Sequence, residues 1–465
     1  MFTSIHNHTE CSNLRFADST IKVETLIDQA IELGYDGVCI TDHEAISGHV
    51  RFLKHYKELK ENGKLPDGFK IGLGNEIYLI DEKDLHMADG LSGKTKYYHM
   101  VLIAKDEIGH RQLRELSSSA WEGYFKQGPA ERVPTYKHKL KEIIGDEKGH
   151  LIASTACLGG ELATKILELK KTKDPKIKTE ITDFLMFLRE TFGGGNVFLE
   201  MQPRMHSEEL EPYDQVIVNR FIVKFANLFQ MRYIVSTDSH YLRKEDRYVH
   251  EAFLNSDATK KGDRELSDFY ETAYMMSEEE VLRHLESHLE SQEAKTAVDN
   301  TRYIWNMLTE YDLAHDVIVP TDKHIPSEVT LGGIFDSYPE YKYIQKFRNS
   351  KDTQERYLLH LIEEGFIEKK QEFNETNLAR IDKELGTMWE VSEKIHQRIA
   401  HYYVLVRELI HKVMWPVSYV GVARGSVTGF YTCYLSGITQ INPIEYNLSD
   451  WRHLDVSRPE LPDCI

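Results

Sequence analysis

Apolar residues in the first half of the chain recur with two alternating spacings. Short runs rich in β-branched residues are separated by longer segments whose apolar residues recur every three or four positions. In residues 22–33, for example, Val23, Leu26, Ile27 and Ala30 form one stripe, which is the pattern of an amphipathic helix. This alternation predicts parallel strands joined by helical crossovers.

The strand pattern occurs often enough to predict a large sheet. Seven such strands in an α/β fold form either a (β/α) barrel or a doubly wound sheet, and we prefer the barrel. The predicted strands occupy residues 2–8, 37–41, 69–80, 97–105, 150–156, 196–202 and 232–238.

The second half of the chain has a different pattern. From about residue 276 to 415 it is mainly helical and charged, and residues 319–341 interrupt it with Pro, Gly and Asp. We therefore predict a first domain over residues 1–275 and a second over residues 276–465.

Composition narrows the class of protein. The chain has 465 residues and a formal charge of -18, so a surface built wholly for nucleic acid is not expected, although a single basic groove is compatible with this charge. Five scattered cysteines and the lack of a signal pattern or a long apolar run predict a cytoplasmic protein without a membrane segment.

Polar side chains of metal-binding types repeatedly follow the predicted strands. In α/β barrels the loops after the strands converge on one site, so we expect these residues to lie together. Imidazole, carboxylate and thiolate groups are the usual ligands of transition metals. The residues are His6 and His8 after the first strand, Asp42 and His43 after the second, Glu76 within the third, Cys157 after the fifth, Glu200 ending the sixth, and Asp238 and His240 after the seventh.

Each of these residues also has a simpler interpretation. Asp42 suits a helix N-cap, Glu76 a solvated strand position, and Cys157 a small core residue. However, Asp238 and His240 repeat the spacing of His6 and His8. The set exceeds the four ligands of a structural zinc site, so two or more ions that share carboxylates fit better, as in enzymes that hydrolyse phosphoesters.

The motifs at these positions resemble a known family. In order, residues 6–18, 40–49, 74–79, 97–104, 154–162 and 236–242 are similar to the motifs of the polymerase-and-histidinol-phosphatase (PHP) domain. The version is similar to the one that opens the α subunit of bacterial or phage DNA polymerase III, a C-family replicative polymerase. The resemblance covers essentially the whole chain.

The resemblance implies a distorted seven-stranded (β/α) barrel with two to three divalent metals, Zn, Mn or Fe. It also implies a metal-dependent phosphoesterase with 3′–5′ exonuclease activity, since every ligand position of the family carries a ligand-competent residue. Asp18 and His99 are assigned by resemblance alone. The implied ligands are His6, His8, Asp18, His43, Glu76, His99, Cys157, Asp238 and His240.

A second motif lies near the end of the chain. Residues 416–430 have the pattern of a short strand, a Gly-containing loop and a helix that begins near Ser426. Backbone N–H groups at such a loop can bind phosphate oxygens, but small residues there also allow a helix to pack tightly. The loop is not a P-loop, because no lysine follows its glycine. The loop resembles the Gly-Arg-Gly-Ser loop of the polymerase palm, which implies that Arg424, Gly425 and Ser426 bind the dNTP triphosphate, with Ala423 in place of the first glycine. That palm resembles the α+β nucleotidyltransferase fold of polymerase β.

The chain ends with Pro462, Asp463, Cys464 and Ile465. The family continues after Pro-Asp with a strand whose carboxylates bind two catalytic Mg²⁺ ions, so the resemblance implies that these carboxylates lie beyond this chain, which alone is not expected to polymerise DNA. Three explanations stay open: a truncated chain, a split polymerase completed by a second chain, or an intein that begins at Cys464.

The sequence therefore predicts the N-terminal portion of a DNA-directed DNA polymerase that acts in DNA replication. Expected partners are DNA at its primer-template 3′ end, dNTPs, the remaining polymerase segment and replisome proteins such as a sliding clamp. Two alternatives are a free-standing phosphoesterase for small phosphate esters and a non-catalytic module stabilised by metals.

Overall fold

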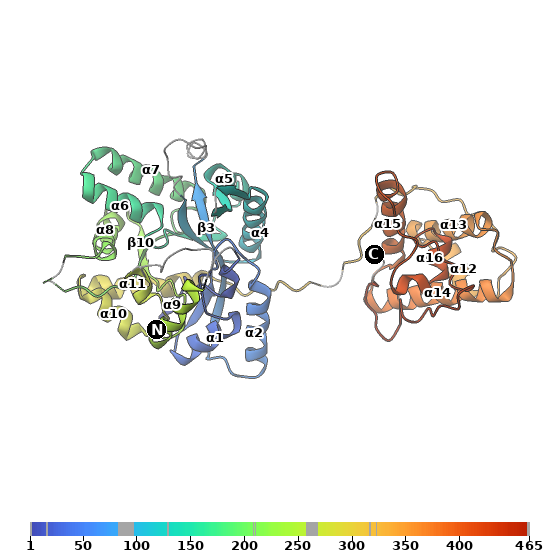
Figure 1. The fold of residues 1–465 in the computed structure, drawn as a ribbon, viewed down its shortest axis with the longest axis horizontal. Helices are drawn as coiled ribbons and strands as arrows, with labels where there is room; N and C mark the ends of the chain where they lie inside the picture. Colours follow the sequence, from blue (N-terminus) through green and yellow to red (C-terminus); the bar gives the residue numbers. More distant parts are fainter. Residues whose placement is uncertain are drawn as a thin grey trace. The chain divides into compact units, whose positions relative to one another are not determined.

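A computed structural model describes most of the chain and divides it into two compact units, residues 1–313 and 314–465 (Figure 1). The described residues are 2–14, 17–81, 97–127, 130–207, 209, 211–256, 268–315, 318–321 and 323–462. Asp463 and Cys464, on which the explanations of the chain end depend, lie outside them.

The first unit contains a curled sheet formed by all seven predicted strands, in the order β1-β2-β3-β4-β8-β9-β10, with the short strand β7 paired to β3. A bridge between Asn7 and Ser239 joins the two ends of this order, so the sheet curls into a barrel at the rim where β1 and β10 end. The strands are β1 (Thr3–Ser4), β2 (Gly37–Ile40), β3 (Lys70–Ile80), β4 (Tyr98–Ala104), β7 (Pro134–Tyr136), β8 (Leu151–Ser154), β9 (Val197–Met201) and β10 (Arg232–Val235), with a separate hairpin of β5 (Phe125–Gln127) and β6 (Ala130–Arg132).

One strand runs against the predicted direction. β4 is antiparallel to both β3 and β8, whereas β1, β2, β3, β8, β9 and β10 otherwise pair in parallel. The expectation of uniformly parallel strands was therefore wrong at β4, because apolar periodicity reports which faces are buried but not the direction of a strand. Its first residues lie at the rim where the other strands end, since His99 pairs with Tyr78 near the end of β3.

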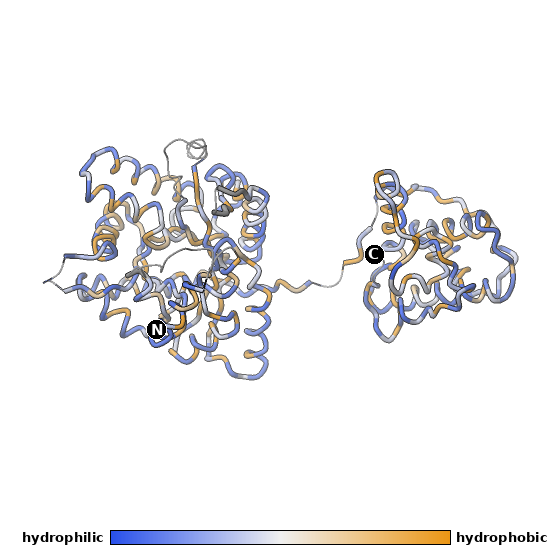
Figure 2. The backbone as a smooth tube through the Cα atoms, viewed as in Figure 1, coloured by the Kyte–Doolittle hydropathy of each residue, from blue (hydrophilic) through white to orange (hydrophobic). Residues whose placement is uncertain are grey.

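Amphipathic helices cover the outside of the barrel. The backbone alternates between blue and orange along the outer helices (Figure 2), as expected for helices with one buried face. The helices of this unit are α1 (Val23–Glu32), α2 (His49–Glu61), α4 (Glu107–Glu122), α5 (Lys137–Ile144), α6 (Glu161–Thr172), α7 (Pro175–Phe192), α8 (Asp214–Phe229), α9 (Arg247–Asn255), α10 (Glu278–Glu286) and α11 (Ser291–Met307).

Helices α10 and α11 belong to the barrel unit, although the charged helical pattern begins near residue 276. The first helix starts with a capping box in which Ser277 accepts from the backbone N–H of Glu280 and the Glu280 carboxylate accepts from that of Ser277. Trp305 of α11 packs so closely on β2 that a Cβ at Gly37 would lie 1.9 Å from its ring. The compact units therefore divide after Leu313, later than residue 275, where the composition changes.

The second unit is helical within its described residues. Its helices are α12 (Lys342–Arg348), α13 (Thr353–Glu368), α14 (Glu375–Ile395), α15 (Ala400–Glu408) and α16 (Tyr431–Leu435), with a π-helical turn over Leu409–Met414. The strand expected from residue 416 is not formed in this described segment, because α15 runs on into the π-helical turn and no neighbouring strand is present there to pair with it. A 3₁₀ helix begins at Ser426, as expected, and α16 follows.

In the described part of the chain, we find no helix long and apolar enough to cross a lipid bilayer.

The contact between α13 and α16 provides a test of this second core. A Cβ at Gly365 would lie 1.8 Å from the carbonyl oxygen of Leu435, whereas a Cβ at Gly421 would have no neighbour within 4 Å. We expect Gly365→Ala to lower the free energy of unfolding by about 2 kcal/mol or more, because backbone must move to admit the methyl group. Chemical denaturation checks this, with Gly421→Ala as the matched control; equal stability of the two variants would contradict the packing described.

Candidate metal centre

The strand ends of the barrel bring buried imidazoles and carboxylates together. Three overlapping groups each have ligand-type atoms within 4.8 Å of one another. His8 is shared by the first two groups, and His43 by the first and third. The groups are His8, Asp18, His43 and His240; His6, His8 and Asp238; and His43, Glu76 and His99.

The distances connect these groups into one cluster. The Oδ1 atom of Asp238 lies 3.3 Å from Nε2 of His6 and 3.0 Å from Nε2 of His8. The Oδ2 atom of Asp18 lies 3.3 Å from Nε2 of His43 and 3.4 Å from Nε2 of His240. The structure thus places Asp18, which was assigned by resemblance alone, next to two histidines that follow strands β2 and β10.

Glu76 connects the cluster to His99. Its two carboxylate oxygens lie 2.7 Å from Nδ1 of His43 and 3.0 Å from Nδ1 of His99. Cys157 lies beside them, with its sulfur 3.5 Å from Nδ1 of His99, but it is in none of the three groups. His99 reaches the cluster because β4 is antiparallel, which explains why it lies near the start of its strand.

Hydrogen bonds from Nδ1 to groups other than the ligand-type atoms of the three groups fix the orientation of three imidazoles. The Nδ1 atom of His6 lies 2.7 Å from Glu200, that of His8 3.1 Å from the Ser12 hydroxyl, and that of His240 2.8 Å from the Asp238 carbonyl oxygen. A proton on each Nδ1 satisfies these acceptors and leaves each Nε2 available to a cation. Supporting hydrogen bonds of this kind are usual for metal-binding histidines.

Glu200 is therefore a supporting residue, a role that its position at a strand end did not reveal. Besides His6, its carboxylate accepts from the hydroxyls of Ser154 and Ser236, and its backbone N–H donates to Thr155 Oγ1 at 2.9 Å. Ser12 was also missed by sequence reasoning, since a lone serine in a loop carries no distinguishing pattern.

Asp42 does not cap the next helix. The next helix, α2, is capped by Gly48, so the N-cap interpretation was wrong, and Asp42 is in none of the three ligand groups. Its carboxylate instead accepts from the backbone and hydroxyl of Thr9 and, at 2.7 Å, from the Ser12 hydroxyl. Burial, partly offset by these bonds, raises the pKa of Asp42 to about 6. The residue thus holds the loop that carries Ser12.

The charges in the cluster shift one another's pKa values. Burial disfavours every charged form, but the imidazoles of His240 and His43 hold the pKa of Asp18 well below its usual value. Burial would lower the pKa of His6, yet Asp238, Glu200 and Glu76 raise it well above the ordinary value. Burial and the neighbouring His43 and His240 lower the pKa of His8 to about 3.

The donor set fits divalent cations. Oδ2 of Asp18 and Oδ1 of Asp238 are buried and accept no hydrogen bond from the described residues, although imidazole nitrogens lie close to them. Such carboxylate oxygens are expected where cations supply the missing partner, and mixed imidazole and carboxylate sets suit Zn, Mn and Fe.

Three of the eight described non-glycine residues with a left-handed backbone lie at this rim. Glu44, Ala156 and Asp238 all have a left-handed backbone, with φ of 51°, 56° and 47°. Glu44 follows His43 and Ala156 precedes Cys157, so each strained residue adjoins or is itself a candidate ligand. A non-glycine residue in this conformation costs of order 1–3 kcal/mol, and here it turns the chain so that the side chains point into the cluster.

The predicted phosphate loop of the second unit is exposed. Gly425 has a φ of 69°, which glycine tolerates without strain. Arg424 is exposed, and the Ser426 hydroxyl lies 3.4 Å from Nδ1 of His453.

Comparison with known proteins agrees with the order of the motifs. Residues 4–204 match the PHP domain, and residues 355–464 match the bacterial DNA polymerase III alpha NTPase domain. The chain is 40% identical over 98% of its length to "Probable DNA polymerase YorL" of Bacillus subtilis and equally to the "DNA-directed DNA polymerase" of Bacillus phage SPbeta. It is 28% identical over 99% of its length to "DNA polymerase III subunit alpha" of Aquifex aeolicus. The chain spans about 36% of each of these relatives.

The hydrogen bond from His6 to Glu200 provides a test of the metal centre. We expect Glu200→Gln to weaken Mn²⁺ binding about 10- to 100-fold, because the neutral amide no longer fixes and polarises His6. Thermal unfolding with increasing Mn²⁺ measures this, since an ion that binds only the folded state raises the melting temperature. The exposed Glu147, which pairs with Arg111, supplies the control Glu147→Gln; unchanged Mn²⁺ dependence in both variants would contradict a site that includes His6.

Proposed function

We propose that this chain, which carries a PHP domain followed by a segment of the DNA polymerase III alpha NTPase domain, is the N-terminal portion of a C-family replicative DNA polymerase. In this proposal, the barrel is a metal-dependent 3′–5′ exonuclease and the second unit is part of the polymerase palm. The observation that carries the exonuclease proposal is the cluster of three overlapping ligand groups at one rim of the barrel.

The size of the cluster supports hydrolysis rather than a structural metal. A structural zinc site is complete with four ligands, whereas this rim gathers eight of the nine proposed ligands into the three groups and places the ninth, Cys157, beside them. The side chain of His99 is 27% exposed, so the cluster is accessible from that side. We propose that the nine residues bind two to three Zn, Mn or Fe ions.

The protein residues would perform distinct tasks in this site. When bound, the ions supply an activated water and stabilise the charge that develops on the phosphate. Asp18 and Asp238 stay ionised, because their neighbouring imidazoles hold both pKa values low. Glu200 and Ser12 keep the imidazoles of His6 and His8 turned toward the centre.

The proposed partners follow from the relatives. We infer that the complete polymerase binds primer-template DNA and dNTPs, uses Mg²⁺ in its palm, and acts in the cytoplasm with a sliding clamp. The remaining polymerase segment would complete the palm.

The proposed exonuclease activity can be tested by DNA hydrolysis. With Mn²⁺ or Zn²⁺, we expect the protein to release mononucleotides from the 3′ end of labelled DNA, and His43→Ala to reduce the rate by at least about 100-fold, because His43 belongs to two of the three ligand groups. Gel analysis of the products measures this. His55→Ala is the control, since His55 lies on the outer helix α2 and pairs with Asp28.

Two results would favour the alternatives. Hydrolysis of small phosphomonoesters but not of DNA would indicate a phosphoesterase for small substrates. Metal binding without any hydrolysis, and indifference to His43→Ala, would indicate a non-catalytic module.

The phosphate loop of the second unit can be tested by nucleotide binding. We propose that Arg424, Gly425 and Ser426 bind the dNTP triphosphate. Arg424→Ala is expected to weaken dATP binding about tenfold, because a charge-assisted contact to phosphate is lost. Isothermal titration in the complete polymerase measures this, with the exposed Arg452→Ala as control; equal affinities would contradict the assignment.

A further inference from the structure

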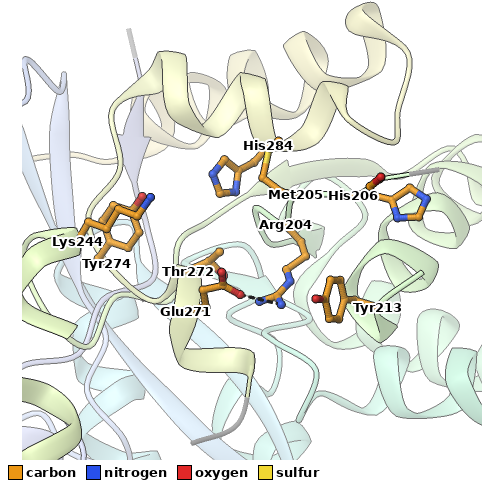
Figure 3. Close-up of a pocket in the computed structure, with 10 residues that line it drawn as sticks. Arg204, Met205, His206, Tyr213, Lys244, Glu271, Thr272, Tyr274 and His284 are labelled. Atoms are coloured by element: carbon orange, nitrogen blue, oxygen red, sulfur yellow. Dashed lines mark ion pairs between the residues drawn. The ribbon is translucent and has the colours of Figure 1, made fainter. Parts of the chain in front are cut away.

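A cavity of about 310 Å³ lies between the segments that follow β9 and β10. Arg204 and Tyr213 line one side, and Lys244, Glu271 and Tyr274 the other, while His284 of α10 lies above them (Figure 3). None of these residues belongs to the nine proposed metal ligands.

Short connections join the cavity to the metal centre. The Gln202 side chain donates to Oδ2 of Asp238 at 3.1 Å, and Arg204 follows two residues later. On the other side, Lys244 follows His240 in the segment after β10. The cavity is therefore built on the same rim as the metal cluster, from chain segments that leave it directly.

Arg204 is held rigidly inside the cavity. Only 5% of the residue is exposed, its guanidinium group pairs with Glu271 at 2.9 Å, and its Cζ atom lies 4.0 Å from the centre of the Tyr213 ring. The Ser287 hydroxyl donates to its carbonyl oxygen and accepts from the backbone N–H of His206. A buried, fixed guanidinium next to an aromatic face suits both a phosphate and a stacked base.

Two imidazole nitrogens at the cavity lack partners. Nδ1 of His206 and Nδ1 of His284 are buried, and neither has a hydrogen-bond partner among the described residues. Buried polar atoms of this kind are normally satisfied, so a polar ligand is a physically reasonable source of the missing bonds. These histidines do not form a metal site with Glu271, since no ligand group of the described residues includes them.

The size and charge of the cavity narrow the ligand class. At about 310 Å³, the cavity is at the lower end of the roughly 300–1,000 Å³ that small-molecule pockets occupy, which is more than a phosphate alone requires. The lining includes the cations Arg204 and Lys244 and the carboxylate Glu271, while Glu280, outside the lining, accepts from the Tyr274 hydroxyl at 3.2 Å. Because Arg204 pairs with Glu271, the remaining positive charge of the lining is that of Lys244, which favours an anion, and the tyrosines and Glu271 offer contacts to a base and sugar.

We propose that this cavity is a nucleotide subsite that binds one nucleotide of the DNA strand whose 3′ end enters the metal centre, with phosphate on Arg204 and Lys244 and the base against Tyr213. The inference rests on the proposed exonuclease function and adds to it a place where the strand is held. A free mononucleotide presents the same chemistry and is expected to bind there as well.

The test compares binding with hydrolysis in matched variants. Tyr213→Ala, Lys244→Gln and Arg204→Gln are expected to weaken binding of dTMP or of an eight-residue thymidine oligonucleotide about tenfold, as titration calorimetry in EDTA measures. Tyr303→Ala is the matched control, since Arg232 lies 3.9 Å from the Tyr303 ring and both tyrosines are 39% exposed. Lys224→Gln, on helix α8, is the control for Lys244. Melting temperatures identify any variant that unfolds. If Arg204→Gln unfolds, the binding measured for Tyr213→Ala still tests the subsite.

Kinetics separates this subsite from the metal centre. The variants are expected to raise KM for the oligonucleotide about tenfold with kcat unchanged, and to hydrolyse bis(p-nitrophenyl) phosphate, which is too small to span both sites, at the wild-type rate. Weaker binding of both nucleotide ligands supports a subsite for one nucleotide, and weaker binding of the oligonucleotide alone supports a strand contact.

Other outcomes distinguish the two proposals. If the wild-type protein hydrolyses no DNA but the variants bind nucleotide more weakly than it does, the exonuclease proposal is refuted and the subsite is not. Normal hydrolysis with wild-type affinity in Tyr213→Ala and Lys244→Gln, or no binding of either ligand by the wild type, would overturn the subsite.

Discussion

The barrel unit depends on the compensation of carboxylates that are almost completely buried at its rim. Asp18, Glu76 and Asp238 are at most 2% exposed, and an unpaired buried charge would cost several kcal/mol. Imidazoles from other strands surround each carboxylate at distances of about 3 Å. The rim is thus stable only when the ends of the parallel strands and the start of β4 meet at the same level, so the architecture of the sheet and the chemistry of the site depend on each other.

This constraint explains several local features that are unfavourable alone. Left-handed backbone at Glu44, Ala156 and Asp238 is costly for each residue, but it turns the chain at the rim where ligand-type side chains must converge. The antiparallel direction of β4 likewise brings His99 to the level of Glu76. These features are consistent with a rim shaped for its site rather than for maximal local stability.

The two compact units bring different chemistries to one chain. The barrel unit gathers ligand-type residues around a buried cluster, with a basic cavity beside it, whereas the second unit presents an exposed Gly-containing loop above a helical core. Their order matches that of the PHP and NTPase domains. In the proposed polymerase, one unit would remove nucleotides and the other would help to add them.

By itself, the sequence determined the seven strands, the amphipathic helices around them and most of the ligand-type residues. Apolar periodicity records burial of each segment, and ligand-type residues after strands point to a shared rim. Asp18 and His99 came only from resemblance, since neither follows a strand. Only the tertiary structure decided the direction of β4, the roles of Ser12, Asp42 and Glu200, and the cavity around Arg204. These depend on contacts between residues far apart in the chain, such as His6 with Glu200, and no local pattern encodes which distant side chains meet.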